Sequence, residues 1–250
     1  MRMESNSKNT LVIVPAFNEE ESIGSLIREI RRTVPELAVV VINDGSVDMT
    51  AVVARQSGAD VLDLPCNLGV GGAVQAGFRY AYEQGYDYVV RCDGDGQHSP
   101  DGIATLMEAM NTGEADLIIG SRFLGKNAHI SNIVRYCGIN VLALLLSAIC
   151  RKRVTDPTSG FQMMNRQLAY FFSRSYPVDY PEPEALALMR REGYEFMEVS
   201  VPFRDRTAGR STIQGWGTLY YVIKVFLALV VDRARSIDHR FSRANLEGKV

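Results

Sequence analysis

Two aspartates separated by one glycine, Asp93 and Asp95, are the residues whose type and spacing best suit chemistry in this sequence. They end the strand-like run YDYVVRCD, and alternate side chains of an extended segment point the same way, so both carboxylates can face one site. Two carboxylates in one cleft repel each other unless a cation lies between them, and Mg²⁺ is commonly held by one or two carboxylates plus substrate phosphates. Together with Gln97 and His98, which follow at once, the pair predicts a divalent-metal site rather than a simple Asp-Gly turn.

In the first half of the chain, strand-like and helix-like segments alternate, and this alternation indicates the elements that position the pair. Short runs rich in β-branched residues indicate strands, and segments with helical spacing lie between them. The alternation predicts an α/β fold, with a doubly wound, mostly parallel sheet flanked by helices. Ligands of such sheets bind beyond the carboxyl ends of the strands. The expected strands are TLVIVP, AVVVIND, ADVLDLP, YDYVVRCD and ADLIIGS.

Polar or glycine-rich residues follow each of these five strands. Glu19 follows the first and Asp44 the second, and a carboxylate there can accept hydrogen bonds from a nucleotide base or ribose. Asp44 fits a helix cap or an Asx-turn as well, and Glu20 and Glu21 fit the negative charge that helix N-termini favour. Five polar strand ends at one edge predict a ligand site there rather than solvated loops alone.

The composition excludes some classes of protein. The chain has 250 residues, 46% of them hydrophobic, and a formal net charge of −2, so it lacks the basic excess of a nucleic-acid-binding protein and we expect no nucleic-acid partner. Four scattered cysteines suit a reducing compartment. The first ten residues are polar and show no secretory signal. We therefore expect a cytoplasmic protein.

Two apolar runs, residues 137–150 and 218–231, are the features that could involve a membrane. Each is shorter than the roughly 20 apolar residues of a bilayer-spanning helix. Two interpretations stay open: a buried core helix, or an interfacial helix resting on a membrane. Arg151, Lys152 and Arg153 follow the first run, and Arg233 and Arg235 follow the second. These cations favour peripheral attachment at the inner face of the membrane.

Taken together, the motifs resemble family 2 glycosyltransferases of the GT-A fold, specifically the dolichol-phosphate mannosyltransferase-like branch. The likeness runs in order from about Thr10 to Ser211. Phe17 stands where the family often has Tyr, and Thr212 where the mannosyltransferases usually carry Lys, so donors linked to GDP and to UDP both remain open. The matching motifs are P-A-F-N-E-E, N-D-G-S-x-D-x-T, N-x-G-x-G-x-A, D-x-D-x-Q-H, G-S-R, D-x-T-S-G-F and R-x-x-G-x-S.

This resemblance implies a metal-dependent enzyme that transfers a sugar from a nucleotide-diphosphate donor, with inversion at the anomeric carbon. The implied cofactor is Mg²⁺ or Mn²⁺. A single domain, 1–250, is expected to contain a nucleotide-sugar-binding half at 10–125, a variable C-terminal acceptor lobe at 126–215, and an amphipathic helix with a charged tail at 216–250. The nucleotide sugar is expected at Pro15, Phe17, Glu19, Ile42, Asp44 and Gly94, the metal at Asp93, Asp95 and Gln97, and the diphosphate at Arg122 and Arg206.

Two classes of acceptor remain open. A polyprenyl phosphate, dolichyl or undecaprenyl, is largely ionised near neutral pH and can attack without a base. A sugar hydroxyl, as in bacterial polysaccharide or O-antigen assembly, needs a positioned carboxylate, a contribution of roughly 10²–10⁴-fold; Asp156 and Glu184 are the candidates. The apolar runs and their arginines favour the lipid phosphate. The residues expected at the acceptor are Thr158, Ser159, Gly160, Arg151 and Arg153.

Two other classes of function share some of these features. A nucleotidyltransferase has the same kind of sheet and acidic pair, but its first loop should be Gly-rich and carry Arg or Lys for a triphosphate, whereas this loop is acidic. A nucleotide-sugar-binding protein without turnover would bind the donor and release no product. The presence of Asp93, Asp95 and Arg122 argues for catalysis.

Overall fold

A seven-stranded sheet forms the centre of the computed structural model, which describes residues 9–124, 133–204 and 224–227. The strands are β1 (Thr10–Ala16), β2 (Ala38–Asn43), β3 (Asp60–Asp63), β4 (Tyr88–Arg91), β5 (Leu117–Ser121), β6 (Gln162–Asn165) and β7 (Phe196–Ser200). Their order across the sheet is β3-β2-β1-β4-β6-β5-β7, and β6 alone among them runs against its neighbours. The five expected strands are present as β1 to β5, so the predicted α/β fold with a mostly parallel sheet is confirmed.

Helices cover both faces of the sheet. They are α2 (Ile23–Thr33), α3 (Thr50–Gln56), α4 (Gly69–Glu83), α5 (Gly102–Met110), α6 (Ile133–Cys150), α7 (Arg166–Ser175) and α8 (Pro181–Arg191). Alternate residues of a strand face opposite sides, and β1 shows both. Leu11 and Ile13 pack in one hydrophobic cluster with α4, α6, α7 and α8, whereas Val12 and Val14 pack in a second with α2, α3 and α5. All of β1 is buried, as expected of a central strand in a covered parallel sheet.

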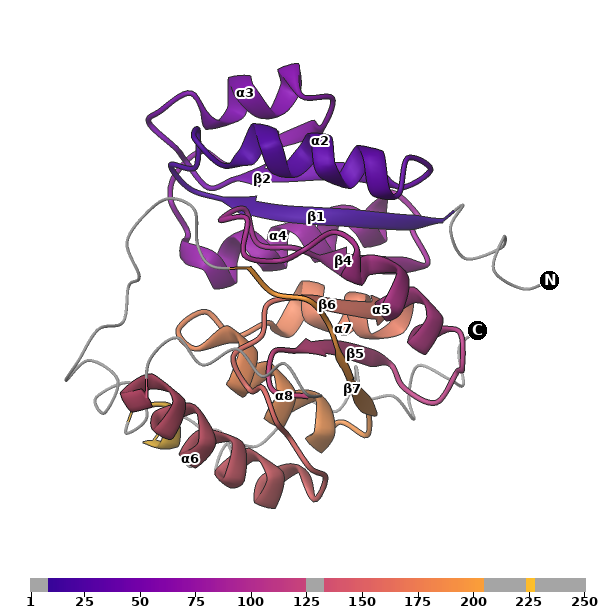
Figure 1. Cartoon of the computed structure of the whole chain (residues 1–250), viewed down its shortest axis with the longest axis vertical. Helices are drawn as coiled ribbons and strands as arrows, with labels where there is room; N and C mark the ends of the chain where they lie inside the picture. Colours follow the sequence, from indigo (N-terminus) through magenta and orange to yellow (C-terminus); the bar gives the residue numbers. More distant parts are fainter. Residues whose placement is uncertain (1–8, 125–132, 205–223, 228–250) are drawn as a thin grey trace.

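The second half of the chain completes the sheet that the first half begins. Figure 1 shows β6 entering between β4 and β5, and β7 lying at the edge beside β5. The run QMMN of β6 has no β-branched residue, so the sequence did not predict it. Met163 and Met164 pair with Val90 and Val89 of β4 and are fully buried, and such tertiary packing decides strand formation more than propensity does. The strands of the two expected halves therefore belong to one sheet.

Helix α6, which contains the first apolar run, is buried on one side only. Leu142 and Leu146 belong to the core, whereas Val141 is 55% exposed and Leu144 is 73% exposed. The buried side of α6 therefore fits a core helix, and its exposed apolar side fits an interfacial helix. The second apolar run lies outside the described residues except for 224–227, where Val225 is buried in the same cluster as Leu142. Within the described ranges, no helix has the length and apolar character needed to cross a bilayer.

Candidate active site

A cleft of about 800 Å³ opens at the carboxyl ends of β1, β2 and β4, where the sequence predicted a ligand site. The pairing of β1 with β4 continues beyond β4, because the Cys92 N–H donates to the Ile13 oxygen (3.1 Å) and the Gly94 N–H donates to the Pro15 oxygen (3.3 Å). This extended segment delivers Asp93 and Asp95 to the cleft. The lining residues are Pro15, Ala16, Phe17, Asn18, Glu19, Glu20, Glu21, Asp44, Asp48, Asn67, Gly69, Val70, Ala73, Asp93, Gly94 and Asp95.

The charge of this cleft is strongly negative. Seven of the described residues that line it are Asp or Glu, and none of them is Lys or Arg. An anionic nucleotide diphosphate cannot enter such a cleft without a compensating cation. Within the described part of the chain, no three His, Cys, Asp or Glu side chains are placed to hold a metal by themselves. Asp93 and Asp95 supply two carboxylates, which fits a hard divalent ion that completes its shell with phosphate and water oxygens.

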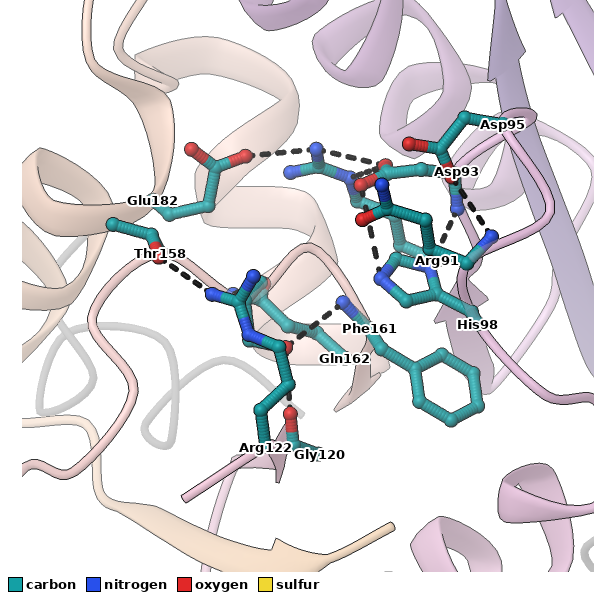
Figure 2. A network of polar contacts seen from close by, with 12 residues as sticks. Arg91, Asp93, Asp95, His98, Gly120, Arg122, Thr158, Phe161, Gln162 and Glu182 are labelled. Carbon is teal, nitrogen blue, oxygen red and sulfur yellow. Dashed lines mark hydrogen bonds and ion pairs between the residues drawn. The ribbon is translucent and has the colours of Figure 1, made fainter. Parts of the chain in front are cut away.

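Asp93 is held by an arginine that the sequence analysis did not single out. The Nε of Arg91 donates to Asp93 Oδ1 at 3.0 Å, and Nη2 lies 2.9 Å from the same oxygen. Figure 2 shows Arg91 between Asp93 and Glu182, whose Oε1 lies 2.8 Å from Nη2. Burial alone would raise the pKa of Asp93, but the charge and hydrogen bond of Arg91 outweigh it, and the pKa is lowered. Asp93 is therefore an ionised carboxylate at neutral pH.

The loop after Asp93 is closed by its own side chains. The Asp93 N–H donates to Nδ1 of His98 at 3.0 Å, so the His98 proton resides on Nε2 and the ring is neutral. Burial lowers the pKa of His98, although Asp93 opposes this shift, and the ring stacks on Phe161 with centroids 5.0 Å apart. The backbone N–H of Gln97 donates to Asp95 Oδ1 at 3.1 Å. Gln97 is not among the residues that line the cleft, and its role as a metal ligand stays a prediction.

Arg122 and Asp156 form a buried ion pair beside this loop. Asp156 accepts hydrogen bonds from Nε (2.7 Å), Nη2 (2.6 Å) and the backbone N–H (3.0 Å) of Arg122. Its side chain is 0% exposed and that of Arg122 is 12% exposed. Nη2 of Arg122 also donates to the Thr158 hydroxyl at 2.6 Å, a contact visible in Figure 2. Asp156 thus orients Arg122, an arrangement that favours a positioning role over proton transfer.

The expected nucleotide residues divide into two groups. Pro15, Phe17, Glu19, Asp44 and Gly94 line the cleft. Phe17 is 45% exposed there, which leaves an aromatic face for a base, and Asp44 accepts the Leu68 N–H at 2.7 Å through Oδ1. Ile42, in contrast, is fully buried in the core and does not line the cleft. Its side chain is therefore not placed to contact a nucleotide.

The expected acceptor residues lie at different distances from the acidic pair. Gly160 packs directly on Asp93, since a Cβ at position 160 would lie 2.2 Å from Asp93 Oδ2. The Ser159 hydroxyl is buried and donates to the Gly120 oxygen at 2.6 Å. Arg151 and Arg153 are exposed after α6. In α8, Glu182, two positions before the candidate base Glu184, forms an ion pair with Arg91. Arg206 lies outside the described residues.

Three charged residues of the site were missed by the sequence analysis. Arg91 had one signal, a charge inside an otherwise apolar strand. Glu182 lies two residues before Glu184 in the sequence, and no sequence signal distinguished it. Glu198 of β7 accepts the N–H groups of Thr155 and Asp156 at 2.8–2.9 Å, and burial raises its pKa. It fixes the beginning of the loop that contains Asp156.

Comparison with known proteins identifies relatives over most of the chain. Residues 11–171 match the profile of the family described as Glycosyl transferase family 2. The undecaprenyl-phosphate mannosyltransferase of Micrococcus luteus is 31% identical over 82% of this chain and 80% of its own length. The polyprenol monophosphomannose synthase of Mycolicibacterium smegmatis is 28% identical over 92% of each chain. Glucosyl-3-phosphoglycerate synthase from Mycobacterium tuberculosis, solved with Mn²⁺, UDP-glucose and phosphoglyceric acid, shares the fold, with a TM-score of 0.68, 24% identity, and coverage of 91% of this chain and 82% of that one.

Proposed function

This chain belongs to glycosyl transferase family 2, and we propose that it is a glycosyltransferase that moves a sugar from a nucleoside-diphosphate donor to a polyprenyl phosphate, with inversion at the anomeric carbon. One observation carries the proposal: the chain is 31% identical, over four-fifths of its length, to an undecaprenyl-phosphate mannosyltransferase. The acidic cleft at the carboxyl ends of β1, β2 and β4 supports it, because it has the residues for a metal-bound nucleotide.

The donor site is assigned to the cleft residues. Phe17 and Asp44 would contact the base and ribose, while Asp93 and Asp95 would hold Mg²⁺ or Mn²⁺. When bound, the ion offsets the negative charge that the leaving diphosphate acquires. Arg122 is fixed by Asp156 and would lie on the acceptor side of the acidic pair. It would stabilise the same developing charge without having to reorient.

The contacts of Asp156 favour a phosphate acceptor. A sugar hydroxyl needs a carboxylate that can take its proton. Of the two candidate bases, Asp156 has both oxygens engaged in hydrogen bonds to Arg122, and Glu184 stays the candidate base for a hydroxyl acceptor. An ionised phosphate needs no base, so it can react in a site where Asp156 is held by Arg122.

Peripheral attachment to the inner face of the membrane would bring the enzyme to its lipid. Helix α6 exposes Cys137, Val141, Leu144 and Ala148 along one stripe, and Arg151, Lys152 and Arg153 follow it, all exposed. An apolar stripe beside a cationic cluster is the arrangement of helices that lie on anionic membranes.

One assay tests this function. The purified full chain is incubated with Mg²⁺, a panel of GDP- and UDP-linked sugars, and either a polyprenyl phosphate or sugars with free hydroxyls as acceptors; released nucleotide and sugar in the organic phase are then measured. We expect one donor to give both signals, and Asp95→Ala to give neither. Turnover with sugar hydroxyl acceptors alone would refute the lipid acceptor, and no turnover with any donor would refute the whole proposal.

A further inference from the structure

Arg91 is an almost completely buried charge of the site, with 1% of its side chain exposed. Each part of its guanidinium has a partner. Nε and Nη2 contact Asp93 at 3.0 and 2.9 Å, Nη2 also contacts Glu182 at 2.8 Å, and Nη1 donates to the Tyr176 hydroxyl at 3.2 Å. One planar fork therefore joins two carboxylates and a phenol in a fixed geometry.

The partners of Arg91 come from both halves of the chain. Asp93 belongs to the loop after β4, whereas Tyr176 follows α7 and Glu182 lies in the first turn of α8. Gly160 covers the same group from a third segment, since a Cβ there would lie 2.9 Å from Arg91 Nη2 as well as against Asp93. Arg91 thus links Asp93 to Glu182 of α8 (Figure 2).

Stability alone is a poor reason for this arrangement. Taking an arginine and its counter-ions out of water costs several kcal/mol per ion, and apolar residues of similar volume often replace such groups without loss of stability. The neighbouring strand residues Val89 and Val90 show that apolar side chains fit this part of the core. The placement of the charge beside Asp93, rather than elsewhere in the core, indicates a role in the site.

We propose that Arg91 is a positioning residue for sugar transfer: it holds the Asp93 carboxylate in the orientation that the divalent ion requires and, through Glu182, couples that orientation to α8. The inference rests on the proposed function, because it takes Asp93 as a metal ligand. Two consequences follow. Removing the guanidinium fork weakens metal binding, even when a positive charge remains. Removing the Glu182 charge alters the site only through Arg91, so its effect disappears when Arg91 is already replaced.

The test compares the wild type with Arg91→Lys, Glu182→Gln and the double variant, all as full chains. Mn²⁺ binding in the presence of UDP or GDP is measured by electron paramagnetic resonance, beside thermal unfolding without metal and steady-state kinetics. We expect the Kd for Mn²⁺ to rise about 10–100-fold in Arg91→Lys, because a lysine ammonium lacks the fork that orients the metal ligand. We expect the double variant to bind Mn²⁺ as Arg91→Lys does, a non-additivity that marks two residues acting as one unit.

Arg190→Lys is the matched control. Arg190 is also largely buried and donates to the backbone oxygens of Cys150 and Tyr194 and to Glu195, in a cluster at the other end of α8. The same substitution there should lower the melting temperature and leave the Kd for Mn²⁺ unchanged. If it raises that Kd as much as Arg91→Lys does, the effect of Arg91 is general destabilisation and the inference is wrong.

The remaining outcomes are also decisive. If the wild type binds Mn²⁺ and Arg91→Lys shows the same Kd and the same turnover, the inference is wrong and the proposed function stands. A wild type that binds neither Mn²⁺ nor nucleotide overturns both. If Arg91→Lys does not fold, Glu182→Gln decides: a changed Kd for Mn²⁺ supports the coupling, and an unchanged Kd with unchanged turnover overturns it.

Discussion

Replacing Asp156 with asparagine separates its two possible roles, as a base and as the group that orients Arg122. Asparagine keeps the shape and one acceptor oxygen, but leaves the guanidinium, 12% exposed, without its counter-ion. Removing one partner of a buried ion pair costs about 3–5 kcal/mol, and the retained oxygen places Asp156→Asn near the lower limit. For a chain of this length each kcal/mol lowers the melting temperature by about 2–4 °C, so we expect a drop of roughly 6–12 °C.

Thermal unfolding followed by circular dichroism, with initial rates on the same samples, measures both effects. If Asp156 orients Arg122, stability falls and kcat falls with it, because Arg122 no longer meets the charge that develops on the leaving diphosphate. If Asp156 is a base, kcat falls by roughly 10²–10⁴-fold with little change in melting temperature. Asp116→Asn is the control, because Asp116 is also buried but accepts from neutral donors, Asn165 Nδ2 and the Glu195 N–H, both at 2.8 Å. A melting temperature unchanged in Asp156→Asn together with a hundredfold loss of kcat would refute the positioning role.

Three further predictions concern the metal, pH and the membrane. We expect Asp95→Ala to abolish transfer, and wild-type activity to vanish with chelator and return with Mg²⁺ or Mn²⁺; full activity in chelator would contradict the metal site. Since burial lowers the pKa of His98 in the folded state, the unfolded chain takes up the proton first, near pH 6.5, so the free energy of unfolding should fall as pH drops below that value. His98→Gln should remove this part of the pH dependence in denaturant titrations, and an unchanged pH profile would argue against it. Leu144→Asp on the exposed stripe of α6 should reduce flotation with anionic liposomes, whereas Val52→Asp, on the partly exposed surface of α3, should not; equal flotation of both variants and the wild type would exclude α6 as the contact.

The sequence by itself predicted the first five strands and the position of the acidic pair. The central strands β1 and β2 are buried runs rich in β-branched residues, and a parallel sheet covered on both faces needs such runs. The order of strand and loop then places Asp93 and Asp95 at the carboxyl edge without knowledge of any tertiary contact. The cleft found there required only local patterns and the general topology of α/β sheets.

Tertiary structure decided which neighbouring residues take part. Glu182 and Glu184 are two positions apart on α8, so about 200° separates them around the helix axis, and only the packing of α8 shows that Glu182 faces Arg91. Ile42 lies in a run with apolar residues on both faces of β2, so its pattern did not show that it points into the core. Asp156 and Arg122 are 34 residues apart and meet because β6 inserts beside β5. Contacts of this kind arise from packing between distant segments, so local sequence patterns do not predict them.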